Sequence, residues 1–145
     1  MSPRPDGYNP LRWNCLEQGC FNHKQRPKIE RFSGAFPGRI NFSDVDGIVE
    51  LFGRGLMLEW KSARMPIPIG QRLMYERLTA DGLLTVFVLA GDARTMAVQA
   101  MAFFHNGRFH RWQACDFEGA FAHMQRWAAW AEKHPWPRPP HLRAV

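Results

Sequence analysis

The sequence lacks both the long apolar run of a membrane-spanning helix and the basic, apolar and small-residue order of a secretory signal. A transmembrane helix requires about 18 or more consecutive apolar residues, and no stretch of the chain comes close to that length. These absences argue against export and against membrane insertion. We therefore expect a cytoplasmic protein without a membrane partner.

Cysteine is scarce as well. The 145 residues include three cysteines, and an odd count in a chain without an export signal argues against a disulfide framework. Cys15, Cys20 and His23 lie close together in sequence, with Cys115 as a candidate fourth ligand, so one hypothesis is a tetrahedral zinc site. Their spacing is irregular for zinc modules, and the alternative is buried free thiols beside a surface histidine.

The composition fits one globular domain. Apolar residues make up 46% of the chain, enough for a single hydrophobic core at this length, and we find no internal repeat. Lysine and arginine number 19 against 13 acidic residues, which leaves a net charge of +6. A basic balance favours polyanionic partners such as nucleic acid without proving them.

Proline marks both ends of the chain. Scattered prolines and glycines predict an irregular arm over about residues 1–40, with short helices only. The closing segment PWPRPPHLRAV, residues 135–145, has too many prolines for helix or sheet. We expect it to be an extended, mobile tail, and a polyproline ligand is the alternative.

The region between the ends has the pattern of an α/β domain with a mixed central sheet flanked by helices. Two apolar segments around Gly53-Arg54-Gly55 predict a hairpin, and Asn106-Gly107 predicts a second one between residues 96–104 and 108–114. The uninterrupted apolar run at residues 83–91 is typical of a strand covered on both faces. Helices are expected from about Ile69 to Asp81 and from an N-cap at Asp116 to His134.

The two predicted helices each carry an apolar stripe at helical spacing, which we expect to face the core. The stripe positions are Ile69, Leu73 and Leu78, with Tyr75 between them, in the first helix, and Phe117, Phe121, Met124, Ala128 and Ala131 in the second.

An acid and a lysine two residues apart interrupt the second strand. Glu59 and Lys61 project from one face of that strand, and the aspartates Asp44 and Asp46 stand at the start of the preceding strand. If the strands pair, Asp46 and Glu59 converge, and converging carboxylates bind Mg²⁺. The lysine could then orient or deprotonate a metal-bound water. The alternative is a solvated ion pair on an exposed sheet face.

These residues resemble the PD-(D/E)xK nuclease superfamily. The resemblance covers about residues 40–92 and rests on Asp46, Glu59-Trp60-Lys61 and the helix that carries Gln71 and Tyr75. Its spacing is most similar to the virus-type replication-repair nuclease (VRR-NUC) branch, and the Gln-x-x-x-Tyr step is also similar to RecB-like exonucleases. Each short motif is weak alone and specific in combination.

The resemblance implies a restriction-endonuclease-like core and a role for each motif residue. Asp46, Glu59 and the backbone carbonyl of Trp60 would hold Mg²⁺ or Mn²⁺, and Lys61 would serve the attacking water. Gln71 would reach toward the active site or the DNA backbone, with Tyr75 supporting it.

Two acidic positions depart from the family pattern or extend it. The proline expected before the first acid is absent, so Asp44 competes with Asp46 for that role. We prefer Asp46 because its distance to Glu59 along the chain fits a short hairpin. Asp44 would then either support the metal ligands from outside or bind a second metal. Glu30, in KIERF, is the candidate for an additional upstream acid, and an ordinary solvated glutamate is the alternative.

The expected function is a metal-dependent DNA nuclease of phage or bacterial replication, recombination or repair. Arg64 and Arg72 would hold DNA phosphates, and a homodimer is the expected assembly if both strands of a duplex are cut. Basic and aromatic residues alternate from Arg108 to Trp112, which suits a nucleic-acid strand or, equally, an amphipathic edge strand. The rival function is a non-catalytic, zinc-stapled nucleic-acid-binding protein on the same fold.

Overall fold

The computed structural model describes residues 27–142 of the chain, which divides into two compact units between Ser43 and Asp44. The described part of the first unit contains the 3₁₀ helix η2, Ile29–Ala35, none of whose residues is buried. The rings of Phe36 and Phe42 meet edge to face there, with centroids 5.4 Å apart. The boundary lies close to the end that we expected for the N-terminal arm.

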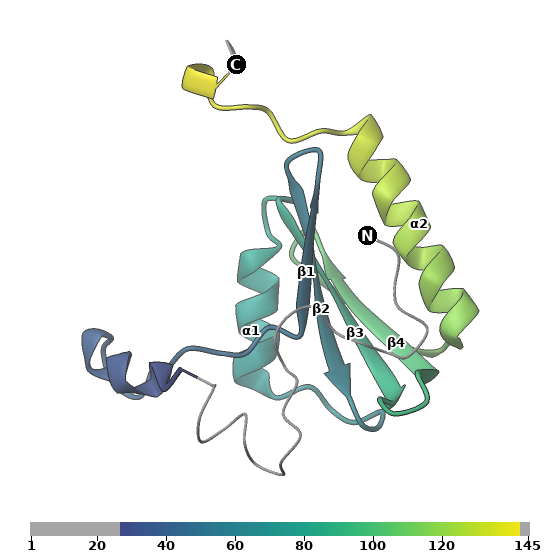
Figure 1. Cartoon of the computed structure of the whole chain (residues 1–145), viewed down its shortest axis with the longest axis horizontal. Coiled ribbons are helices and arrows are strands. Elements are labelled where there is room, and N and C mark those ends of the chain that lie inside the picture. The colour runs from purple at the N-terminus through teal and green to yellow at the C-terminus, as the bar shows by residue number, and fades with distance from the viewer. Residues whose placement is uncertain (1–26, 143–145) are drawn as a thin grey trace. The chain divides into compact units, whose positions relative to one another are not determined.

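The second unit is built on a mixed five-stranded sheet, which confirms the predicted α/β fold class (Figure 1). The strands follow one another across the sheet in chain order, and only β2 and β3 are parallel. They are β1 (Gly47–Leu51), β2 (Arg54–Lys61), β3 (Leu84–Asp92), β4 (Ala97–His105) and β5 (Arg108–Ala114). The parallel pair requires a crossover, which is the helix α1 (Ile69–Leu78).

The sheet lies between two helices and has a separate core on each face. The helix α2, Phe117–Lys133, covers the face that carries Phe87 and Leu89 of β3, and α1 covers the face that carries Val86 and Val88 (Figure 1). The central strand β3 is buried over most of its length, as its apolar run predicted. Within residues 27–142, neither helix has the length and apolar content of a membrane span.

Two tight turns confirm the predicted hairpins. Asn106 and Gly107 join β4 to β5 with φ angles of 50° and 76°, the positive values of a type I′ turn. Phe52 and Gly53 join β1 to β2 with φ angles of 54° and 81°. The expected turn through Gly53-Arg54-Gly55 is therefore one step late, because Arg54 already pairs with Leu51 in the ladder.

The predicted stripe of α1 is correct only at Tyr75. Ile69 is 77% exposed, Leu73 and Leu78 are exposed too, and Tyr75 is the residue that α1 buries. The helix ends at Leu78, where the hydroxyl of Thr79 donates to the Tyr75 carbonyl over 2.7 Å. A ten-residue helix can be rotated about its own axis in several ways against the sheet. The packing of the Tyr75 ring against the Phe104 ring, with centroids 5.2 Å apart, decides between them.

The predicted stripe of α2 is correct only in its second half. Phe117 and Phe121 are exposed, and the face toward the sheet is formed by Ala120, Trp127 and Ala131. The predicted N-cap is confirmed, because the Asp116 carboxylate accepts a hydrogen bond from the Gly119 amide over 2.8 Å.

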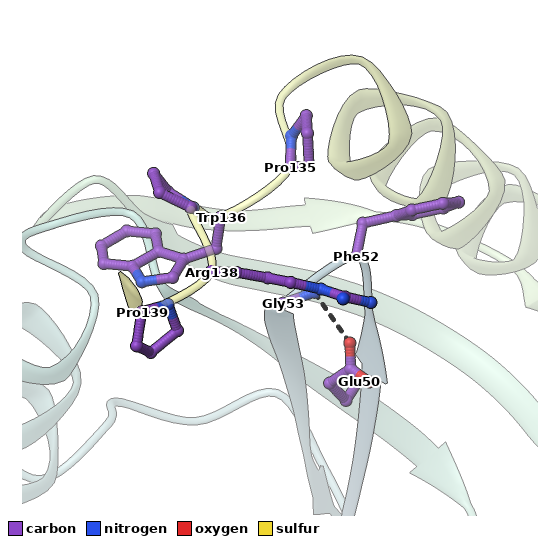
Figure 2. Close-up of a pocket in the computed structure, with 8 residues that line it drawn as sticks. Glu50, Phe52, Gly53, Pro135, Trp136, Arg138 and Pro139 are labelled. Atoms are coloured by element: carbon purple, nitrogen blue, oxygen red, sulfur yellow. Dashed lines mark hydrogen bonds between the residues drawn. The ribbon is translucent and has the colours of Figure 1, made fainter. Parts of the chain in front are cut away.

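The C-terminal tail lies outside helix and sheet over residues 135–139, as its prolines predicted, and contacts the β1–β2 turn there. Pro140–Leu142 forms the 3₁₀ helix η3, so the exclusion of helix is wrong at that point. The Trp136 amide donates to the Phe52 carbonyl over 2.9 Å, and Figure 2 shows Trp136, Arg138 and Pro139 arranged around this turn. Tail and hairpin enclose a pocket of about 580 Å³. The proline content alone did not indicate this contact.

Arg54 connects the start of β2 to three other parts of the unit. Its guanidinium donates to the Gly82 carbonyl over 2.7 Å and to the carbonyl of His134. It also lies 4.4 Å from the ring centre of Trp130 and 5.4 Å from that of Trp136, in cation–π geometry.

We predict that Arg54→Met lowers the free energy of unfolding by about 1–3 kcal/mol, because the carbonyls of Gly82, in a partly buried hydrogen bond, and of His134 lose a charged donor. Urea denaturation measures the change. Arg77→Met, the same substitution at an exposed position of α1, is the control and should change stability by about 0.5 kcal/mol or less. Equal losses in both variants would contradict the role of Arg54.

Candidate functional site

The candidate site lies at the carboxyl end of β2, on the sheet face that α1 covers. Strand alternation places Glu59 and Lys61 on the same face as Met57, which packs in the core beneath α1. Trp60 points the other way and packs against the core beneath α2. The acid and the lysine therefore share one face, as their spacing predicted.

Glu59, Lys61 and Gln71 form a closed triangle of contacts. The Lys61 Nζ lies 3.4 Å from Glu59 Oε1 and donates to Gln71 Oε1 over 3.1 Å. The Gln71 Nε2 in turn donates to Glu59 Oε1 over 3.5 Å. Only 15% of the Glu59 side chain and 20% of the Lys61 side chain are exposed. The pair is thus shielded by α1, unlike a fully solvated ion pair on an open sheet.

Asp46 joins this cluster from the position just before β1. β1 begins with Gly47 opposite Leu58, so the same antiparallel register, continued by one residue, places Asp46 opposite Glu59. Residues in such a cross-strand pair project from the same face, with Cβ atoms about 4.5–5.5 Å apart. The Asp46 Oδ2 also accepts a hydrogen bond of 2.6 Å from the Trp60 amide, which fixes the aspartate at the end of the hairpin.

The backbone carbonyl of Trp60 faces the same opening. In a strand, the N–H and C=O of one residue point toward the same neighbour. The Trp60 N–H donates to the side chain of Asp46, which lies just before the first residue of β1. The Trp60 carbonyl therefore also points to this side, beyond the start of β1. Two carboxylates and one carbonyl oxygen therefore converge beyond the start of β1.

This donor set fits a hard divalent cation. Mg²⁺ prefers oxygen ligands, commonly takes one or two carboxylates and keeps several waters. Residues 27–142 contain no group of three or more acidic, histidine or cysteine side chains that could hold a metal. With two carboxylates and one carbonyl oxygen, a site here would suit a metal that retains several waters.

Tyr75 lies one helical turn beyond Gln71 and is almost fully buried. Burial raises the pKa of its hydroxyl well above the ordinary value, and the negative charges of Glu59 and Asp46 raise it further. A hydrogen bond with Gln71 acts in the opposite direction. Tyr75 is therefore a neutral hydrogen-bond donor close to both carboxylates.

The two arginines expected to hold phosphates contact residues of β5 or of α1. Arg64 donates to the Trp112 carbonyl over 3.3 Å. Arg72 pairs with Glu76 over 2.9 Å, and its guanidinium lies 4.7 Å from the centre of the Phe109 ring. Both arginines line one pocket with Phe109 and Trp112. The sequence did not indicate this, because simple strand alternation places Phe109 and Trp112 on opposite faces.

The roles of the remaining candidates stay predictions. Asp44 is exposed, and Glu30 belongs to the first unit, so the role of each stays a prediction. Cys15, Cys20 and His23 lie outside the described residues. Cys115 is a free thiol whose pKa is raised by burial and by Asp116, so the zinc hypothesis stays a prediction.

Comparison of the chain with protein-family models, with curated proteins and with solved structures gives no match. The interpretation of the site therefore depends on its own geometry and on the motif residues.

We predict that Tyr75 ionises only well above pH 10 in the folded protein. Because its folded pKa is raised, its contribution to stability is present below about pH 10 and is lost as the pH rises further. In a Tyr8→Phe variant, which leaves Tyr75 as the single tyrosine, tyrosinate absorbance should appear only together with unfolding. A normal titration curve with the fold intact would contradict the buried, carboxylate-facing position.

Proposed function

We propose that this protein is a metal-dependent DNA nuclease that hydrolyses phosphodiester bonds. The observation that carries the proposal is the convergence of Asp46, Glu59 and Lys61, with Gln71, at one end of β2. Two acids that can share a cation beside a positioned lysine are the elements that metal-assisted hydrolysis of a phosphodiester requires.

The resemblance to the PD-(D/E)xK superfamily supports the proposal through the order of the elements. A hairpin carries Asp46 and the Glu59-x-Lys61 triplet, the crossover helix carries Gln71 and Tyr75, and the next strand is parallel to β2. We propose that these elements form a restriction-endonuclease-like core. The net charge of +6 supports DNA as the partner.

Each residue of the cluster would have a separate role in hydrolysis. Asp46, Glu59 and the Trp60 carbonyl would hold Mg²⁺ or Mn²⁺, which when bound supplies an activated water and offsets charge on the phosphate. Lys61, held by Gln71 and Glu59, would orient the attacking water by donating a hydrogen bond to it.

Gln71 and Tyr75 would keep the reacting groups in place. Gln71 bonds to both Glu59 and Lys61, so it fixes their separation. Tyr75 stays protonated and can donate to the Glu59 carboxylate without competing for a cation. Replication, recombination or repair remains the proposed setting, and a homodimer remains the proposed assembly for cutting both strands.

We predict that Lys61→Ala lowers the cleavage rate by about 100-fold or more, because a positioned hydrogen-bond donor at the reacting centre contributes about 10²–10³ in rate. Affinity for DNA in EDTA should change by about twofold or less, since Lys61 is one of 19 basic residues. Cleavage of labelled single-stranded, duplex and branched DNA over a Mg²⁺ titration measures the first effect, and fluorescence anisotropy measures the second.

Lys133→Ala, at the exposed end of α2, is the matched control and should retain full activity. Wild-type protein that binds DNA and never cleaves it, over the whole Mg²⁺ and Mn²⁺ range, would favour the non-catalytic binding protein. Parallel loss of binding and cleavage in Lys61→Ala would also assign this lysine to binding.

We predict that Gln71→Ala slows cleavage by the equivalent of about 1–3 kcal/mol, because Lys61 and Glu59 lose the side chain that positions both. Thermal stability should be kept, since alanine is the better helix former. The rate is measured at saturating Mg²⁺ and subsaturating DNA. Gln125→Ala, the same change at an exposed position of α2, is the control. An unchanged rate in Gln71→Ala would remove this residue from the site.

A further inference from the structure

A pocket of about 340 Å³ lies between α1, the segment that precedes it and the edge strand β5. Its lining includes three arginines and two aromatic rings: Arg64, Arg72, Arg111, Phe109 and Trp112. No acidic residue is among the lining residues. Arg72 is paired with Glu76 nearby, so Arg64 and Arg111 leave the pocket with an excess of positive charge.

An irregularity in β5 brings the two aromatic rings to one face. His110 pairs with Phe103 of β4, and Gln113 pairs with Met101, so three steps along β5 match two steps along β4. The extra residue is a β-bulge, which reverses the alternation of the strand. Phe109 and Trp112 therefore both pack beside the core under α1, and His110 stacks on Phe103 with centroids 4.1 Å apart.

Both rings are held in place by neighbouring groups. The indole Nε1 of Trp112 donates to the Met65 carbonyl over 2.8 Å, and Arg64 donates to the carbonyl of Trp112 itself. The Phe109 ring packs against Phe104 with centroids 4.9 Å apart and lies under the Arg72 guanidinium. A fixed aromatic surface loses little conformational entropy when a flat ligand binds to it.

Residues that line the pocket are close in sequence to residues of the candidate active site. Arg72 follows Gln71 directly on α1, and Arg64 comes three residues after Lys61. The acid–lysine cluster and the pocket both lie on the sheet face that α1 covers. One nucleic-acid strand could therefore contact both.

We propose that this pocket binds an unpaired nucleotide of the DNA strand that enters the active site. The base stacks on the ring of Trp112, beside Phe109, and the flanking phosphates contact Arg64 and Arg111. Bases inside a duplex are stacked on each other and cannot offer a free face, so the preferred substrate is single-stranded DNA or the unpaired part of a branched molecule. This inference rests on the proposed nuclease function.

The test measures binding without cleavage. The full chain is titrated in EDTA against a labelled oligothymidylate and against a duplex of the same length, with anisotropy as the readout. Trp112→Leu should weaken binding of the single strand by roughly 5- to 100-fold, because one stacked base is lost, and duplex binding by about twofold or less. Phe121→Leu, which removes an exposed ring from α2, should change neither.

A second pair of variants leaves the core intact. Arg111→Gln should weaken single-strand binding and reduce its salt dependence by about 0.7 in the slope of log affinity against log salt, the value for one phosphate. Arg108→Gln, on the same strand and outside the pocket, should leave both unchanged. Melting curves show whether Trp112→Leu is folded, and the arginine pair decides the outcome if it is not.

Equal losses on single strand and duplex, or no loss on either, would overturn the inference. Failure of the proposed function has a different signature. In that case the wild type binds the single strand with the same dependence on Trp112 and Arg111, yet no DNA is cut in Mg²⁺ or Mn²⁺.

Discussion

The antiparallel register of β1 against β2 is the constraint on which the candidate site depends. It places Asp46 opposite Glu59, and a slip of one residue would turn Asp46 to the other face of the sheet. The register is set at the far end of the hairpin, where Phe52 and Gly53 both have positive φ angles. Gly53 is also confined by Trp136, because an added Cβ would lie 2.9 Å from the Trp136 Cβ. The tail and the turn at one end of the sheet thus help to determine which carboxylates meet at the other.

The parallel pairing of β2 with β3 determines that α1 lies next to the candidate site. A parallel connection must return over the sheet, and the short link after Lys61 places the first turn of α1 next to the end of β2. Gln71 and Tyr75, four residues apart, then share the helix face that meets Glu59. The same geometry explains the exposure of Ile69, because a helix that turns its glutamine and tyrosine inward must turn that residue outward.

Features with a local physical cause could be predicted from the sequence, and those that depend on packing could not. The Asn106-Gly107 turn, the Asp116 cap and the shared face of Glu59 and Lys61 follow from backbone conformation, capping and strand alternation. The rotation of α1, by contrast, depends on where Tyr75 finds space against the sheet. The bulge in β5 leaves no mark in the alternation of its residues, so the common face of Phe109 and Trp112 was hidden.

The charges of the acid–lysine cluster and of the pocket complement each other. Asp46 and Glu59 carry two negative charges against the single positive charge of Lys61, so the cluster alone repels a phosphate. The pocket that Arg64 and Arg111 line has a positive excess and attracts one. Under the proposed function, a divalent cation would reverse the sign of the cluster, while the arginines and the aromatic surface hold the strand independently of the cation. Such a division separates strand binding from hydrolysis, because residues that bind in the absence of metal need not be the residues that react in its presence.

The bulge in β5 has a further consequence at this edge of the sheet, since it twists β5 and makes it a poorer template for pairing with another strand. One irregularity therefore both forms the aromatic surface and protects the edge of the sheet that carries it.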